Sequence, residues 1–149
     1  MNFVLKLIIF LSVAAIVYSD DEKFKLDDLV EAMMGFTDEC EEPKPTKENA
    51  KEVIKFVKDA QKPSKCLRYC LMSQFNLITE GETRLKKDET VKMMSMMYSD
   101  ADKDLEEIVE MCNDRNEKEM DKCENAHLHG ICIYEELLAR DYKMPEFEE

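Results

Sequence analysis

The fold class that the sequence predicts is all-α, with six helices in one disulfide-bonded domain. Three observations support this prediction. Apolar residues recur three and four positions apart along most of the chain, which is typical of amphipathic helices. No segment after residue 19 alternates between apolar and polar residues as a half-buried strand would. Six cysteines occur in a short chain with a secretory start, which indicates three disulfides.

Residues 1–19 are predicted to be a signal peptide. Lys6 precedes an uncharged apolar run, and Val17 and Ser19 suit signal peptidase at the −3 and −1 positions. The run is too short for a comfortable transmembrane helix, which needs about 20 apolar residues, so a retained anchor is the less favoured alternative. We expect a secreted, extracellular protein whose single domain covers residues 20–149, without stable membrane insertion.

The charge balance excludes two classes of partner. The chain has a formal net charge of −13, and removal of Lys6 with the signal peptide changes this to −14. Nucleic acids and anionic membrane surfaces bind proteins through basic patches, so neither is an expected partner. The excess of acidic side chains also favours solubility.

The first two helices are predicted from apolar periodicity and from the residues that interrupt it. One helix is expected over residues 24–36. Pro43 and Pro45 exclude helix from the loop that follows, since proline lacks an amide proton and clashes with the preceding turn. Thr46 is a suitable N-cap for a second helix, which should stop before Pro63.

The third predicted helix covers residues 63–78 and is central to the disulfide framework. Ser64 is its expected N-cap. Cys66 and Cys70 are four positions apart, so both thiols project from one face, with Cβ atoms about 5–6 Å apart. A disulfide needs a Cβ separation of about 3.5–4.5 Å. If these two cysteines are oxidised, they must therefore bond to other segments of the chain.

Three more helices complete the prediction. Asp88 is expected to cap the fourth helix, and Ser99 or Asp100 is expected to start the fifth. Asp121 and Glu124 form a pair resembling a capping box, which predicts the start of the sixth helix. Each of these starts is followed by apolar residues at helical spacing.

Catalysis finds little support in the sequence. His127 and His129 are two positions apart, about 200° around a helix, so they cannot share one face or one metal ion. No nucleophile lies in a motif such as G-x-S-x-G, and the many carboxylates are expected on solvated helix faces. Zinc is the alternative role for the cysteines, but no C-x-x-C pair occurs. We predict no enzyme activity, no cofactor and no metal, and we expect both histidines at a wet surface.

Methionine is used heavily around the fourth predicted helix, at Met93, Met94, Met96 and Met97. Thioether side chains are flexible and polarizable, so they can repack around apolar guests of different shape. The alternative is that a methionine stripe at helical spacing forms ordinary core, and composition alone favours that alternative.

The cysteine spacing is the most specific signal in the chain. The pattern Cys40-x25-Cys66-x3-Cys70-x41-Cys112-x10-Cys123-x8-Cys132 resembles the six-cysteine signature of the insect odorant-binding protein family, pheromone-binding proteins included. The x3 and x8 intervals are nearly fixed in that family, and Ala126 also fits its pattern. The resemblance extends from the first predicted helix to just past the last cysteine.

The resemblance implies six helices that enclose a buried apolar pocket. It also implies which cysteines pair, whereas six cysteines alone allow 15 connectivities. The implied pairs are Cys40–Cys70, Cys66–Cys123 and Cys112–Cys132. The residues expected to line the pocket and bind its ligand are Met33, Ile54, Leu71, Phe75, Met93, Met94, Met97, Tyr98, Ile108, Met111, Leu128, Ile131, Tyr134 and Leu138. Candidate polar anchors for a ligand are Tyr98, Tyr134 and Ser95.

The C-terminal segment departs from part of the family. Only 17 residues follow Cys132, too few for the seventh, pocket-entering helix of some moth pheromone carriers. Residues 140–149 form a short acidic tail, and we place Met144 and Phe147 at the pocket mouth.

The function implied by the resemblance is that of a carrier for small hydrophobic semiochemicals, odorants or pheromones. Such a carrier binds its ligand non-covalently and transports it through extracellular fluid to an olfactory receptor, as a monomer or weak homodimer. One alternative is a secreted non-olfactory carrier or interaction protein of saliva or reproductive fluid on the same scaffold. A second alternative is a saposin-like lipid-interacting protein, but the C-x-C and C-x-x-C elements of that class do not occur.

Overall fold

A computed structural model describes residues 24–41, 43–98 and 102–148 of the chain. The predicted signal peptide and the predicted fifth-helix starts, Ser99 and Asp100, lie outside these residues. The described elements are β1 (Phe24–Lys25), α2 (Leu26–Met34), α3 (Lys47–Ile54), α4 (Lys62–Gln74), α5 (Lys87–Ser95), α6 (Asp102–Asn116), α7 (Lys122–Ala139) and β2 (Phe147–Glu148). The prediction of an all-α domain with six helices is confirmed. Among the described helices, none has the length and apolar character needed to cross a membrane.

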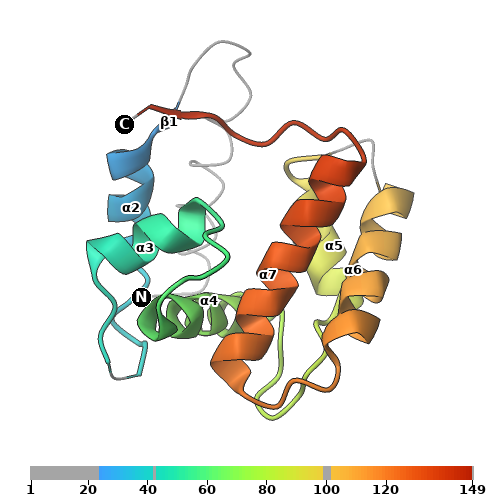
Figure 1. Ribbon diagram of the computed structural model, residues 1–149, viewed down its shortest axis with the longest axis horizontal. Helices are drawn as coiled ribbons and strands as arrows, with labels where there is room; N and C mark the ends of the chain where they lie inside the picture. The colour runs from blue at the N-terminus through green and yellow to red at the C-terminus, as the bar shows by residue number, and fades with distance from the viewer. Residues whose placement is uncertain (1–23, 42, 99–101, 149) are drawn as a thin grey trace.

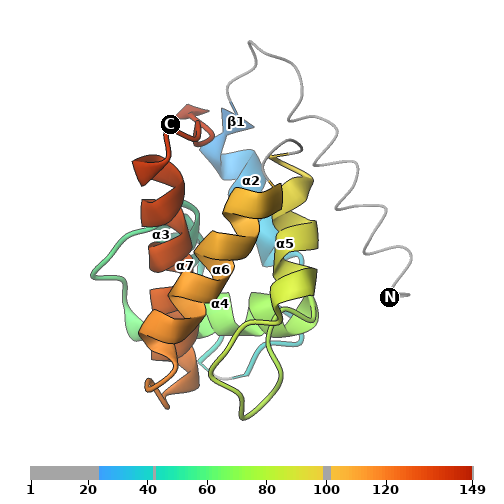
Figure 2. The ribbon, with the colours of Figure 1, turned by 90° about the vertical axis from the view of Figure 1, so that its right-hand side faces the viewer.

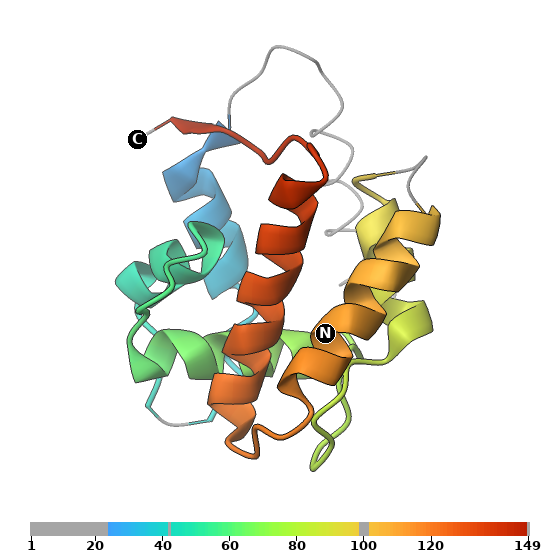
Figure 3. The same ribbon diagram turned by 45° about the vertical axis from the view of Figure 1, so that its right-hand side comes forward.

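The six helices form two halves joined by α4 and α7. In Figures 1 and 3, α2 and α3 lie on one side of α7, and α5 and α6 lie on the other. Helix α4 crosses the end of the molecule opposite the C-terminus, where it packs against α3 and α7. Figure 2 shows α5 and α6 side by side, and α6 also packs against α7.

Each half has its own apolar core. The first, which we call the α2–α4 cluster, comprises Leu26, Val30, Cys40, Ala50, Val53 and Leu67. The second, which we call the α5–α7 cluster, comprises Ile78, Leu85, Met94, Leu105, Ile108, Val109, Cys112, Cys132 and Leu137. Each core is small, because a domain of this length buries a limited fraction of its surface.

The helix starts agree only in part with the predicted caps. Thr46 caps α3 in a complete capping box with Asn49, and its hydroxyl accepts from the Asn49 amide at 3.3 Å. Asp121 caps α7, because one carboxylate oxygen accepts from the Cys123 and Glu124 amides at 2.9 Å each. The reciprocal half of the predicted box is wrong: the Asp121 amide donates to Glu119, two residues before.

Two other predicted caps are wrong. Helix α4 begins at Lys62 with Gln61 as N-cap, since Pro63 fits the first turn, where no amide proton is needed. The Ser64 hydroxyl is buried inside that turn and accepts from the Asn49 side chain at 3.0 Å instead. Helix α5 begins at Lys87, one residue before the predicted cap Asp88.

Three helices end in the same hydrogen-bonded motif, although none of them has glycine there. Phe56, Asn76 and Asp141, which follow α3, α4 and α7, adopt left-handed backbone with φ of 50°, 60° and 62°. In each case the amides of this residue and the next donate back to the last turn of the helix. This is the Schellman arrangement, in which the left-handed residue is usually glycine.

The Schellman motif corrects the predicted length of the second helix. The Phe56 amide donates to the Val53 carbonyl at 3.3 Å, and the Val57 amide donates to the Glu52 carbonyl at 3.1 Å. Helix α3 therefore ends at Ile54, whereas periodicity predicted a helix that continued almost to Pro63.

One pair of very short strands accompanies the six helices. The two ends of the described chain pair in parallel, with Phe24 opposite Phe147 and Lys25 opposite Glu148. Each strand has only two residues, too short for any alternating pattern to be visible in the sequence. The C-terminal tail therefore runs from α7 across to β1, as Figure 1 shows.

Candidate functional site

The disulfides connect α4 to segments far away in the sequence. Their pairs are Cys40–Cys70, Cys66–Cys123 and Cys112–Cys132, with Cα–Cα distances of 5.7, 4.3 and 5.7 Å. These are the pairs that the resemblance implies, and no cysteine is free. Cys66 and Cys70 tie α4 to α7 and to the loop after α2, so this helix is the hub of the framework.

The residues expected to line a pocket are divided between the two halves of the molecule. Met33, Ile54 and Leu71 pack against the α2–α4 cluster. Met94 and Ile108 belong to the α5–α7 cluster. The remaining buried or half-buried members of the set are Phe75, Met93, Tyr98, Leu128, Ile131 and Tyr134. Residues contributed by α4 and α7 lie at the junction of the halves, because these two helices pack against each other.

Three residues of the expected set lie at the surface instead. Met97, Met111 and Leu138 expose 46%, 39% and 46% of their surface. Helical spacing placed each of them on the apolar stripe of its helix. That stripe is wider than the face of the helix that the neighbouring helices cover, so these side chains reach solvent. These side chains line no enclosed wall in this structure.

Two of the proposed polar anchors have partners within the protein. The Tyr98 hydroxyl lies 3.3 Å from the Met144 sulfur, and it donates to the Lys143 carbonyl at 3.4 Å. The Tyr134 ring stacks on Phe56, with centroids 4.5 Å apart and planes at 11°. Half-burial raises the pKa of Tyr98 above its ordinary value, so this hydroxyl is neutral at physiological pH.

The tail contacts both halves of the molecule. Met144 packs against the α5–α7 cluster, and Phe147 packs against the α2–α4 cluster. The Tyr142 hydroxyl donates to Asp104 of α6 at 2.7 Å. The tail thus bridges the two cores on the side where β1 and β2 pair.

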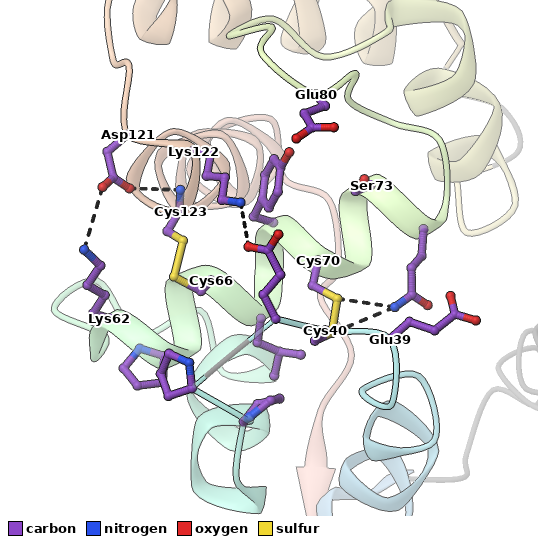
Figure 4. Close-up of a pocket in the computed structure, with 17 residues that line it drawn as sticks. Glu39, Cys40, Lys62, Cys66, Cys70, Ser73, Glu80, Asp121, Lys122 and Cys123 are labelled. Atoms are coloured by element: carbon purple, nitrogen blue, oxygen red, sulfur yellow. Dashed lines mark hydrogen bonds and ion pairs between the residues drawn. A yellow bond between two sulfur atoms is a disulfide. The ribbon is translucent and has the colours of Figure 1, made fainter.

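A cavity of about 720 Å³ lies elsewhere, along the face of α4 that carries two of the disulfides (Figure 4). Its lining residues are Glu39, Cys40, Glu41, Pro43, Pro45, Lys62, Pro63, Cys66, Leu67, Tyr69, Cys70, Ser73, Gln74, Glu80, Asp121, Lys122 and Cys123. No residue of the expected pocket set is among them. Apolar periodicity gave no sign of this cavity, because charged and polar side chains of α4, α7 and the loops beside them form much of its lining.

Both lysines in this cavity are paired with carboxylates. Lys122 bonds to Glu41 at 2.7 Å, and its ammonium lies 5.1 Å from the centroid of the Tyr69 ring. The hydrogen bond from Lys122 lowers the pKa of the Glu41 carboxyl below its ordinary value. Lys62 and Asp121 approach to 3.9 Å across the same cavity. A lining of paired charges suits a polar partner better than an apolar ligand.

Both histidines are buried, so the expectation of a wet surface is wrong. His127 and His129 expose 3% and none of their surface. The His127 Nε2 lies 2.8 Å from the Lys58 carbonyl oxygen, and the His129 Nε2 lies 2.8 Å from the Thr83 carbonyl oxygen. Because a carbonyl only accepts, each Nε2 carries a proton, and burial lowers the pKa of both rings below the ordinary value. Among the residues the structure describes, no three His, Cys, Asp or Glu side chains are placed to hold a metal ion.

Comparisons with known proteins agree with this framework. A sequence model of the PBP/GOBP family matches residues 22–136. A solved structure, odorant-binding protein dmelOBP28a from Drosophila melanogaster, is similar in fold with a TM-score of 0.59 at 20% sequence identity. The match covers 79% of this chain and 93% of that chain. No curated protein sequence matches the chain.

Proposed function

Because the chain belongs to the PBP/GOBP family of insect odorant-binding proteins, we propose that it carries odorants or pheromones through an extracellular fluid to receptors. Members of this family are non-enzymatic carriers of small hydrophobic ligands, and membership is the observation that carries the proposal. The three disulfides support an extracellular location, since such bonds persist in oxidising compartments. We further propose that residues 1–19 are removed on secretion and that the mature carrier is a monomer or weak homodimer.

The ligand is proposed to lie between the two apolar clusters, where α4 and α7 meet. Leu71 of α4 and Ile131 and Tyr134 of α7 are expected lining residues that these two helices carry. The cavity of Figure 4 is the less suitable site for such a ligand, because paired charges line it. An apolar chain there would separate those charges from water without replacing their solvation.

The mechanism needs no covalent step. Burying about 12 methylenes at about 0.8 kcal/mol each gives roughly 10 kcal/mol. An association cost of at least about 4 kcal/mol leaves a Kd of roughly tens of micromolar or better. Tighter binding requires a polar group of the protein that recognises the ligand's own polar group.

The test is displacement of an apolar fluorescent probe from the oxidised protein by alcohols, esters and fatty acids of graded chain length. Saturable one-to-one binding with an optimum chain length supports the carrier. No binding, with all three disulfides confirmed by peptide mapping, overturns it and favours a secreted interaction protein. Leakage of vesicles without a saturable soluble site favours a saposin-like protein instead.

A pair of variants tests where the ligand lies. Leu71→Ala creates space against the α2–α4 cluster and should shift the optimum to longer chains. Met120→Ala is the matched control, because 76% of Met120 is exposed between α6 and α7. Equal optima for the two variants and the wild type would contradict the proposed location.

A further inference from the structure

Arg68 is a buried cation in the middle of α4. Only 7% of its surface is exposed. Its Nη2 donates to the Val53 carbonyl, in the last turn of α3, at 2.9 Å. Its guanidinium carbon lies 4.9 Å from the centroid of the Phe56 ring, and that ring stacks on Tyr134 of α7. The guanidinium is therefore held at the junction of α3, α4 and α7.

Helix α7 comes unusually close to this side chain. A Cβ added at Gly130 would lie 2.4 Å from Arg68 Nη1 and 2.8 Å from its Cδ. Glycine at this position thus makes room for the guanidinium against the helix backbone. Gly130 thus accommodates a bulky cation on the facing helix. A smaller apolar residue in place of Arg68 would avoid the free-energy cost of burying a charge.

No carboxylate among the described residues pairs with Arg68. The other three arginines each bond to acidic side chains: Arg84 to Glu110, Arg115 to Glu136 and Arg140 to Asp104. In contrast, Arg68 has a neutral carbonyl and an aromatic face as its partners, and its Nε is buried without an acceptor. Burial lowers the pKa of Arg68 to about 10, so the group is cationic at neutral pH.

A buried charge without a counter-ion is costly, and such groups are concentrated at functional sites. The chain carries 34 acidic side chains, so a counter-ion for Arg68 was readily available in the sequence. The cover over the guanidinium is also strained. Phe56 has φ of 50°, which is rare for a bulky residue and stores strain in the loop that covers the guanidinium.

We propose that Arg68 binds the carboxylate of an acidic amphiphile, so that the cargo of this carrier includes long-chain carboxylic acids. This deepens the proposed function and rests on it. The carboxylate accepts from the guanidinium, including the unused Nε–H, and replaces the missing counter-ion. The alkyl chain extends along the junction of α4 and α7, past Leu71 and Ile131. The Phe56 ring, on the loop between α3 and α4, is the part of the wall that yields to admit it.

The first experiment compares dodecanoic acid, dodecanol and methyl dodecanoate at pH 7.5 in probe displacement. The wild type should bind the acid at least about tenfold more tightly than the alcohol, because a charge-assisted hydrogen bond is stronger than a neutral one. Arg68→Met retains most of the side-chain volume without the charge, and it should lose this preference, so that acid and alcohol displace the probe about equally well.

Arg84→Met is the matched control. It removes the same charge from a surface site, where Arg84 bonds to Glu110, Asp114 and Glu117. The preference for the acid should be unchanged in this variant. An equal loss in both variants would assign the effect to net charge and would overturn the role of Arg68.

A second measurement does not depend on the folding of a variant. In the wild type labelled with ¹⁵N, the Arg68 Nε–Hε resonance should shift on addition of dodecanoic acid and stay unchanged with dodecanol. A residue that only supports the end of α3 would not distinguish these two ligands. Equal affinity for acid and alcohol, together with an unshifted resonance, overturns the proposal while the carrier function stands. If no ligand displaces the probe at all, the carrier function itself fails.

Discussion

Gly130 shows how one residue determines what its neighbours can be. The absent side chain leaves the space that the Arg68 guanidinium fills, so two helices meet more closely there than two larger residues would permit. Alanine usually stabilises the interior of a helix by about 1 kcal/mol relative to glycine. At this position that gain is opposed by a contact that the buried arginine cannot easily avoid.

We therefore expect Gly130→Ala to destabilise the protein by about 1–3 kcal/mol, the usual cost of overpacking. Urea unfolding at constant m-value provides the measurement. In an Arg68→Ala background the same substitution should become neutral or stabilising, because the contact is gone. If Gly130→Ala destabilises both backgrounds equally, the close approach of Arg68 is not the cause.

The buried histidines predict how stability depends on pH. In the unfolded chain both rings have a pKa near about 6.5, and in the folded protein burial lowers it. As the pH falls through about 6.5, the unfolded state takes up more protons than the folded state, so the free energy of unfolding decreases. Protonation of His129 would also add an N–H at Nδ1, which is buried without a partner.

Thermal unfolding should therefore show a lower Tm at pH 5.5 than at pH 7.5. The carboxyls of Glu52 and Asp121, with pKa values lowered in the fold, add their own loss only below about pH 4.5. His129→Gln retains a donor toward the Thr83 carbonyl and should reduce the drop between these two pH values. An unchanged drop in that variant would assign the effect to His127 or to other groups.

At the scale of elements, two helix starts were visible in the sequence, whereas three helix ends left no local signal. Thr46 and Asp121 are side chains that cap by their own chemistry, so their positions are visible in the sequence. The ends of α3, α4 and α7 place Phe56, Asn76 and Asp141 in left-handed backbone, where glycine would have been the signal. Tertiary contacts, such as the stack of Phe56 on Tyr134, support these conformations and leave no local pattern.

Helix α3 depends on its cap because it has only eight residues. Thr46→Ala removes the hydroxyl that accepts from the Asn49 amide, and it should lower the free energy of unfolding by about 1 kcal/mol. Thr46→Ser retains the acceptor and should change stability much less. Urea unfolding of the two variants distinguishes the cap from a general effect of substitution at this position.

The C-terminal tail, whose Met144 and Phe147 we expected at a pocket mouth, contacts both apolar clusters. Its contacts with both clusters and its pairing with β1 support a prediction about ligand exchange. Truncation after Tyr142 removes Met144 and β2 but retains the end of α7 and all three disulfides. We expect ligand to dissociate several-fold faster from this variant, measured by stopped-flow displacement of the probe, with helix content unchanged in circular dichroism.

Lys143→Ala is the control for the truncation, because its exposed side chain lies in the same segment. It should leave the dissociation rate unchanged. Unchanged dissociation from the truncated protein as well would show that the tail does not cover the route of exchange.

At the scale of the whole molecule, the cysteine spacing predicted more than the periodicity did. The intervals between the cysteines indicated the family, and the family implied the three disulfide pairs, which join segments far apart in the sequence. Periodicity identified apolar stripes, but it could not show which part of a stripe faces solvent. Met97 and Leu138 are exposed for this reason, and Arg68 was missed because a charged residue in a helix is usually on the surface.

The three disulfides also determine what a single proteolytic cut can do to the protein. The closed loops 40–70, 66–123 and 112–132 overlap end to end along the chain. Any single peptide-bond cleavage between Cys40 and Cys132 therefore falls inside at least one loop, and the two fragments stay covalently joined. A nicked molecule would migrate as one species until it is reduced, so damage in the exposed connections need not release the cargo.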